Sequence, residues 1–176
     1  ANGTFVCKVG FAPGAQQGTW TLVWVSLYDA AGNSALVQTP ELQAAGYPTT
    51  LQVTNPDEDI APPTLSGVSY ASTVKVTEAL SVTITASDAG LGVDRVGPVF
   101  RNPSGTQYAS CTANTPASGT RASGTWVCSV TFAPGAETGT WTLEWVALFD
   151  RAENNRDVTK AELEAAGYPT TLTVTP

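Results

Sequence analysis

Hydrophobic and polar residues alternate in short segments along this chain, and such alternation predicts β-strands. The clearest segment is residues 81–86, where Val82, Ile84 and Ala86 should face inward and the threonines between them outward. Segments rich in glycine, proline and aspartate separate the strands and predict turns. Other strands are expected at Thr64–Tyr70 and Thr73–Thr77, interpreted as one strand with a kink, and at Val93–Phe100, Thr106–Thr112, Thr125–Phe132 and the last residues of the chain.

The most hydrophobic segment comprises residues 140–150. Every second residue from Trp141 to Phe149 is hydrophobic, whereas Val146 and Leu148 have the opposite parity. A strand with hydrophobic residues on both faces, and a change of parity within it, indicates a central strand that carries a bulge. We assign the two tryptophans of this segment to the core.

One short helix is expected before the last strand. Thr159 can cap its first turn, Glu162 stands three residues later as in a capping box, and Gly167 can end it. A similar segment earlier in the chain offers Thr39 as the cap and Gly46 as the end. The sequence therefore predicts this helix twice.

The last part of the chain repeats its first part. Residues 3–54 align without a gap on residues 124–175, with 34 of 52 aligned pairs identical. We therefore divide the chain into the C-terminal half of a repeat (1–54), a linker rich in proline and aspartate (55–63) and a complete repeat (64–176).

The expected fold class is all-β, with immunoglobulin-like antiparallel β-sandwich repeats and one short helix before the last strand. Seven or so strands separated by turns, over about 110 residues, are typical of such a sandwich. Three strands of an incomplete copy would leave a large hydrophobic face uncovered. We therefore expect the missing strands to come from further sequence or from a neighbouring molecule.

Composition excludes several functions. The chain has 15 acidic and 8 basic residues, a net charge of −7 and no histidine. Nucleic acid is an unsuitable partner for such a chain, and histidine-based zinc sites and catalytic triads are excluded. Hydrophobic runs are too short to span a membrane. The carboxylates occur in turns, without a hydrophobic pocket that would raise a pKa, so we do not expect an enzyme.

Several motifs together resemble a known family. They are Pro-Pro-Thr-Leu at 62–65, Val-Thr-Ile-Thr-Ala-Ser-Asp at 82–88, Gly-x-Trp-Thr-Leu at 139–143 and Asp-Ala-Ala-Gly-Asn at 29–33. Their order is similar to that in the bacterial immunoglobulin-like tandem repeats of large secreted and cell-surface, adhesin-like proteins. One departure is that the last motif becomes Asp-Arg-Ala-Glu-Asn at 150–154, which weakens any loop function carried over to the second copy.

The resemblance implies an extracellular structural or adhesive protein, a building block of a stalk or a surface filament. Its partners would be further immunoglobulin-like repeats, in the same chain or in neighbouring copies that complete the half domain. Neither nucleic acid nor membrane insertion is expected. The alternative function is a carbohydrate- or other ligand-binding module of a secreted multidomain enzyme. Two or more coplanar exposed tryptophans or tyrosines on one face would favour that alternative. Buried tryptophans and a line of loop carboxylates at the domain junction would favour the structural function.

The cysteines also agree with an extracellular location. Cys111 and Cys128 lie 17 residues apart at the two ends of a hairpin-like segment, where a disulfide is expected. Two buried thiols are the alternative. Cys7 is the repeat equivalent of Cys128 and has no equivalent of Cys111 beside it, so we expect it to be unpaired or paired externally.

Acidic residues occur in loops that an immunoglobulin-type sandwich would bring to one end. Carboxylate and amide oxygens are the ligands of Ca²⁺, and the resemblance also implies calcium at such places. The alternative is that aspartate and asparagine simply favour turns. Calcium is the one cofactor expected, and its candidate ligands are Asp57, Asp59, Asp88, Asp94, Asp150 and Asn154.

Overall fold

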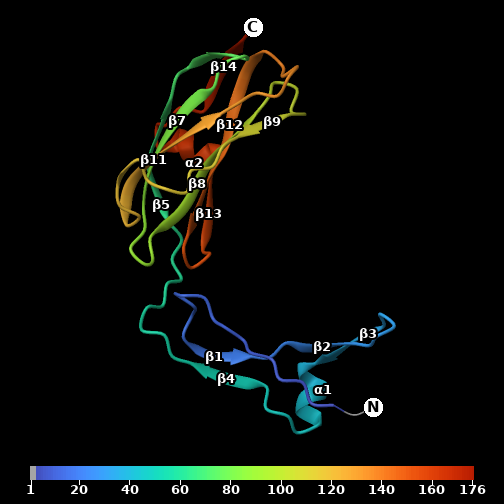
Figure 1. Cartoon of the computed structure of the whole chain (residues 1–176). Helices are drawn as coiled ribbons and strands as arrows, with labels where there is room; N and C mark the ends of the chain where they lie inside the picture. Colours follow the sequence, from blue (N-terminus) through green and yellow to red (C-terminus); the bar gives the residue numbers. More distant parts are fainter. Residues whose placement is uncertain (1–2) are drawn as a thin grey trace.

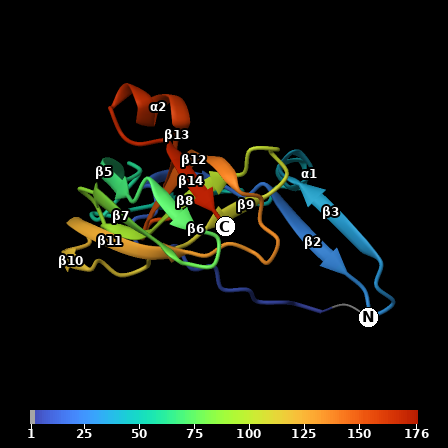
Figure 2. The same cartoon turned by 90° about the horizontal axis from the view of Figure 1, so that it is seen from above.

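The computed structural model describes residues 3–176. Its complete copy is a sandwich of two mainly antiparallel sheets (Figures 1 and 2). The four-stranded sheet has the order β10 (Ser118–Gly119), β11 (Ser123–Val130), β7 (Leu80–Ser87), β5 (Thr64–Tyr70). The six-stranded sheet has the order β6 (Thr73–Lys75), β14 (Thr171–Thr175), β12 (Gly139–Asp150), β8 (Val93–Arg101), β9 (Tyr108–Ser110), and β13 (Asn155–Thr159) also pairs with β12.

The core fills the space between the two sheets and confirms the predicted alternation. Val82, Ile84 and Ala86 of β7 are fully buried, whereas the threonines between them are partly exposed. The predicted disulfide is also confirmed, because Cys111 and Cys128 are bonded with their Cα atoms 5.9 Å apart. Since Cys111 follows β9 and Cys128 lies in β11, the bond joins the two sheets.

The expected kink between the first two segments is a crossing between sheets. β5 pairs with β7 in the four-stranded sheet, whereas β6 pairs in parallel with β14 in the six-stranded sheet. The short connection between them therefore passes from one layer of the sandwich to the other.

Strand β12 carries the predicted bulge, between Leu143 and Trp145 in its pairing with β8. The extra residue reverses the parity, so that Val146, Leu148 and Asp150 face the core beyond it. Our assignment of Trp145 to the core is wrong for this reason: its side chain is only half-buried and lies beside Tyr108, with ring centroids 6.3 Å apart.

Helix α2 (Lys160–Ala165) has the predicted capping box, in which Thr159 and Glu162 each accept from the other's backbone amide. Helix α1 (Thr39–Ala44) begins one residue earlier than predicted, because its N-cap is Gln38. The hydroxyl group of Thr39 instead donates to the main-chain oxygens of Leu22 and Val23.

The first copy repeats the local structure of the second. β1 (Gly18–Thr21) pairs with β4 (Thr50–Val53), and β2 (Trp24–Tyr28) pairs with β3 (Ser34–Gln38), in the registers of the β12–β14 and β12–β13 pairs. Residues 4–9, which are equivalent to most of β11, form no strand. Figure 1 shows these strands as a thin layer on the other side of the linker, with no second layer from residues 3–176 packed on it.

No helix within residues 3–176 is both long and apolar enough to cross a membrane.

Candidate metal centre at the junction

Three of the predicted ligands meet where the linker joins the complete copy. Asp59 comes from the linker, Asp88 follows β7, and Asp150 is the last residue of β12. One carboxylate oxygen of each lies within 4.8 Å of the other two. The side chains are buried, with exposed fractions of 6%, 5% and 0%. The bulge in β12 explains the position of Asp150, because the reversed parity turns its side chain inward.

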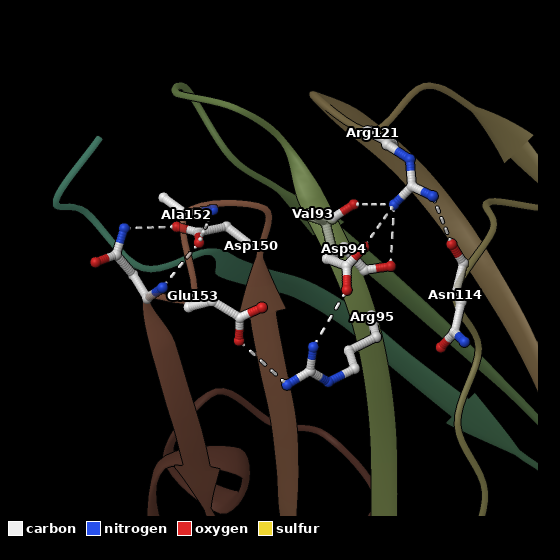
Figure 3. Close-up of polar contacts among 9 residues, drawn as sticks. Val93, Asp94, Arg95, Asn114, Arg121, Asp150, Ala152 and Glu153 are labelled. Atoms are coloured by element: carbon white, nitrogen blue, oxygen red, sulfur yellow. Dashed lines mark hydrogen bonds and ion pairs between the residues drawn. The ribbon is translucent and has the colours of Figure 1, made fainter. Parts of the chain in front are cut away.

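The loop after β12 holds Asp150 in place (Figure 3). Its Oδ1 atom accepts from the backbone amides of Ala152 and Asn154, each at 2.8 Å, and its Oδ2 atom accepts from the Asn154 side chain at 2.8 Å. Burial raises the pKa of Asp150, and the nearby charge of Asp59 adds to the shift, while the hydrogen bonds from Asn154 and Ala152 oppose it. The hydrogen bonds of the loop therefore partly offset the effect of burial and of the Asp59 charge on the Asp150 carboxylate.

A turn after β7 holds Asp88 in a similar way. Its Oδ1 atom accepts from the backbone amides of Gly90 at 3.0 Å and Gly92 at 2.9 Å. Within residues 3–176, the hydrogen bonds to the Asp88 side chain all go to this Oδ1 atom. One oxygen thus fixes the turn, and the other accepts none of these bonds.

Asp59 fits against the same turn. Its Oδ2 atom accepts from the backbone amide of Leu91 at 2.7 Å. A Cβ atom on Gly90 would stand only 2.1 Å from the Asp59 carboxylate, so the absence of a side chain there makes room for it. The Asp59 main-chain oxygen accepts from the Asn154 side chain at 2.8 Å. The linker aspartate is therefore held by both loops of the complete copy.

The first copy also contacts the linker. The Gly14 main-chain oxygen accepts from the Asp59 amide at 2.9 Å. Glu58 accepts from the Gln17 backbone and side chain at 3.0 and 3.1 Å. Gly14 is buried against Leu91 and Ala152 of the complete copy. The cluster thus lies at the contact between the two copies.

No lysine or arginine forms an ion pair with Asp59, Asp88 or Asp150 within residues 3–176. The nearby basic residues Arg95 and Arg121 form ion pairs with Asp94 instead. Their Nη1 atoms lie 3.2 and 3.5 Å from its carboxylate oxygens (Figure 3). Asp94 is also not among the carboxylates that lie within 4.8 Å of one another.

Asp57 is exposed, and its backbone amide donates to Asn55. The structure thus brings together four of the six predicted residues. Of these four, Asn154 directs its side-chain amide at the main-chain oxygen of Asp59 and at the carboxylate of Asp150, so in the observed arrangement it positions the other residues.

The donor set fits a hard divalent cation. Ca²⁺ binds oxygen at 2.3–2.6 Å, so two of its ligand oxygens lie at most about 5 Å apart, and it takes six to eight of them. Three carboxylates that are buried together without a basic partner repel one another, and a cation would neutralise them. Asp59, Asp88 and Asp150 would hold the ion, and waters or backbone oxygens would complete its shell.

The equivalent loop of the first copy provides a comparison. Asp29 accepts from Ala31 at 2.9 Å and from the Asn33 backbone and side chain at 2.8 and 2.7 Å, as Asp150 does from its own loop. Position 32 is glycine with φ 87°, and its equivalent Glu153 keeps the left-handed conformation with φ 67°. The sequence change in this loop has therefore not changed its geometry. Asp29 is exposed, and hydrogen bonds from Asn33 lower its pKa.

The tryptophans of the complete copy do not form a flat platform. Trp126 and Trp141 are buried. Trp145 is half-buried, and its ring is inclined by 53° to that of Tyr108. The sequence had indicated that coplanar exposed rings would favour a sugar-binding surface, and this arrangement lacks them within residues 64–176.

In comparisons with known proteins, no family model matches this chain and no curated protein matches it significantly.

Proposed function

We propose that this protein is an extracellular structural repeat protein in which Ca²⁺ fixes the angle between successive immunoglobulin-like units. The observation that carries the proposal is the cluster of Asp59, Asp88 and Asp150 between the linker and the complete copy. An ion bound by all three would tie a flexible connection to a rigid sandwich. A chain built in this way would project its far end at a fixed orientation.

Two further features support a structural function outside the cell. The disulfide between Cys111 and Cys128 is typical of proteins made for oxidising compartments. The repeat of one unit within the chain is typical of extended arrays, in which each unit contacts only its neighbours. The resemblance to bacterial surface repeats agrees with both.

The experiment compares calcium binding and thermal unfolding of the whole chain with those of Asp88→Asn. This variant keeps an oxygen that can accept from Gly90 and Gly92, and it removes one of the three charges. We expect the parent chain to bind Ca²⁺ in a calorimetric titration and to melt several degrees higher with Ca²⁺ than with chelator. We expect Asp88→Asn to bind at least about tenfold more weakly. In chelator it should melt at or above the parent temperature, because charge repulsion is relieved.

The matched control is Asp29→Asn, in the loop of the first copy that has the same hydrogen bonds but belongs to no carboxylate cluster within residues 3–176. Its calcium affinity should equal that of the parent. Small-angle X-ray scattering with and without chelator then tests whether Ca²⁺ fixes the angle between the units. We expect a broader distribution of interatomic distances without Ca²⁺. An identical melting temperature and an identical scattering curve in both conditions would exclude the proposal.

A further inference from the structure

The first copy exposes hydrophobic side chains whose repeat equivalents form the core of the complete copy. Trp20, Leu22 and Leu27 have exposed fractions of 42%, 43% and 54%. Their equivalents Trp141, Leu143 and Leu148 are at 1%, 0% and 0%. We call the first set, together with Val9 and Leu51, the open face; the equivalents of these last two, Val130 and Leu172, are also fully buried.

The complete copy shows which segment covers the equivalent face. In the complete copy, β8 pairs with β12 over Val93–Arg101, and β7 pairs with β11 over Leu80–Ser87. Both strands belong to the front half of the repeat, residues 64–121. The corresponding strands β1 and β2 have no such neighbour within residues 3–176, and an apolar groove of about 800 Å³ borders Phe11, Trp20 and Leu22.

A cysteine without a disulfide partner in the described part of the chain lies two residues before Val9 of the open face. Cys7 is exposed and forms no disulfide within residues 3–176. Its equivalent Cys128 is bonded to Cys111, which the front half supplies. Residues 4–9, around Cys7, are not a strand, although their equivalents in β11 pair with β7.

We infer that the open face binds the front half of a further repeat of this kind, a segment with the strand pattern of residues 64–121 and a cysteine at the position of Cys111, which forms a disulfide with Cys7. This inference rests on the internal repeat and not on calcium. The front half of this same chain is not a free donor, because its own back half holds it and the Cys111–Cys128 disulfide locks it.

Binding should change three properties together. Residues 4–9 become a strand paired with the equivalent of β7. The environment of Trp20, whose equivalent Trp141 is buried, becomes apolar, which shifts its fluorescence to shorter wavelength. The Cys7 thiolate comes within bonding distance of the partner cysteine.

The first test supplies the partner as a separate fragment, residues 62–123, prepared as a mixed disulfide between its Cys111 and glutathione. The Cys7 thiolate attacks the fragment sulfur, a new disulfide joins the two chains, and glutathione leaves as its thiolate. One disulfide is broken and one is formed, so no other oxidant is needed. We expect this exchange to be at least about 100-fold faster than with a short peptide around Cys111, because docking holds the sulfurs together.

Two substitutions on one ribbon provide a matched pair. Leu27 and Leu36 are both exposed, and they lie at neighbouring positions of the paired strands β2 and β3. The equivalent of Leu27 is the buried Leu148, whereas that of Leu36 is the exposed Asp157. Leu27→Asp should therefore remove the rate advantage, and Leu36→Asp should leave it unchanged.

A fused chain keeps the inference falsifiable if the fragment aggregates. Residues 62–123 are joined directly in front of Gly3, which reproduces the natural Ser123–Gly124 junction. Refolding is carried out with oxidised and reduced glutathione, so that oxidised glutathione takes up the electrons of the new bond. We expect no free thiol in the fused chain, and emission from Trp20 like that of buried tryptophan.

Two free thiols and a solvent-exposed Trp20 in the fused chain would overturn the inference. So would a 176-residue chain that sediments as a dimer sensitive to Leu27→Asp and shows no faster exchange with the fragment. That result would assign the open face to a second copy of the chain. The Cys7→Ser variant separates docking from bonding, because it should still show the fluorescence shift without the disulfide.

Discussion

The Asn154 side chain donates a hydrogen bond of 2.8 Å to the main-chain oxygen of Asp59, and so connects the loop after β12 to the linker. The same amide nitrogen donates to Asp150 at 2.8 Å. A single side chain therefore fixes the linker and one carboxylate of the cluster together. Changes to either side of this connection should affect the junction more than the sandwich.

The first prediction concerns the space that Asp59 occupies. Gly90→Ala would place a methyl group 2.1 Å from the Asp59 carboxylate, and the backbone at Gly90 is not left-handed, so the effect arises from the contact. We expect Asp59 to leave the cluster, a loss of about 1–3 kcal/mol in the free energy of unfolding with Ca²⁺, and a smaller gain from Ca²⁺. Differential scanning calorimetry with and without chelator measures both.

The control for this change is Gly10→Ala. Nothing lies within 4 Å of a Cβ atom at Gly10, and the equivalent position holds Thr131. Its melting temperature and its response to Ca²⁺ should match those of the parent. If Gly90→Ala also behaves like the parent, the contact with Asp59 does not hold the linker.

The second prediction concerns the disulfide between the sheets. Replacing both Cys111 and Cys128 by serine should lower the free energy of unfolding of the complete copy by about 3 kcal/mol, because the unfolded chain regains the freedom of a 17-residue loop. Guanidinium unfolding followed by tryptophan fluorescence gives the value. Cys7→Ser should leave the free energy of this unfolding transition unchanged, since Cys7 lies outside the complete copy.

The third prediction uses the repeat as its own comparison. Leu143→Ala should cost about 2–5 kcal/mol because it empties part of a closed core. Leu22→Ala, at the equivalent position, should change the free energy of unfolding by no more than about 0.5 kcal/mol, because that side chain is exposed. Urea unfolding of the two variants side by side tests this. Equal costs would show that the face of the first copy is closed in solution.

The fourth prediction concerns pH. Hydrogen bonds from the Thr159 backbone and side chain, and then from Arg156, lower the pKa of Glu162 from 4.5 to about 2. A carboxylate whose folded-state pKa lies below its unfolded value stabilises the fold above the unfolded value. This contribution should therefore be present above pH about 4.5 and be lost as the pH falls toward 2. Carboxyl NMR titration measures the pKa directly.

Thr159→Ala should raise the pKa of Glu162 toward its ordinary value, because the side-chain hydrogen bond is lost. Lys160→Ala should leave the pKa of Glu162 unchanged, since Lys160 forms its ion pair with Glu164, at 3.6 Å. A Glu162 pKa near 4.5 in the parent chain would mean that the capping box does not form in solution.

The sequence predicted features that depend on local pattern. The alternation of Val82, Ile84 and Ala86, the cap at Thr159 and the pairing of Cys111 with Cys128 all follow from spacing, and all are confirmed. Strand β13 was not predicted, because Val158 is its only hydrophobic residue and its pairing with β12 defines it.

Features that depend on tertiary contacts were harder to predict. The bulge itself was expected, but its exact position was not, and that position decides that Asp150 points inward and Trp145 does not. The carboxylates of Asp88 and Asp94 are equally plausible ligands in the sequence. The structure separates them, because Asp88 lies with Asp59 and Asp150 whereas Asp94 pairs with Arg95 and Arg121.

The identical ladder registers of the two copies have a practical consequence. Each position of the back half occurs twice in one molecule, once in a copy whose core is closed and once in a copy whose hydrophobic face is open. A single hydrogen-exchange experiment on one sample can therefore record, position by position, how much protection the front half confers. Temperature, buffer and concentration are the same for both copies, so they cannot contribute to the difference.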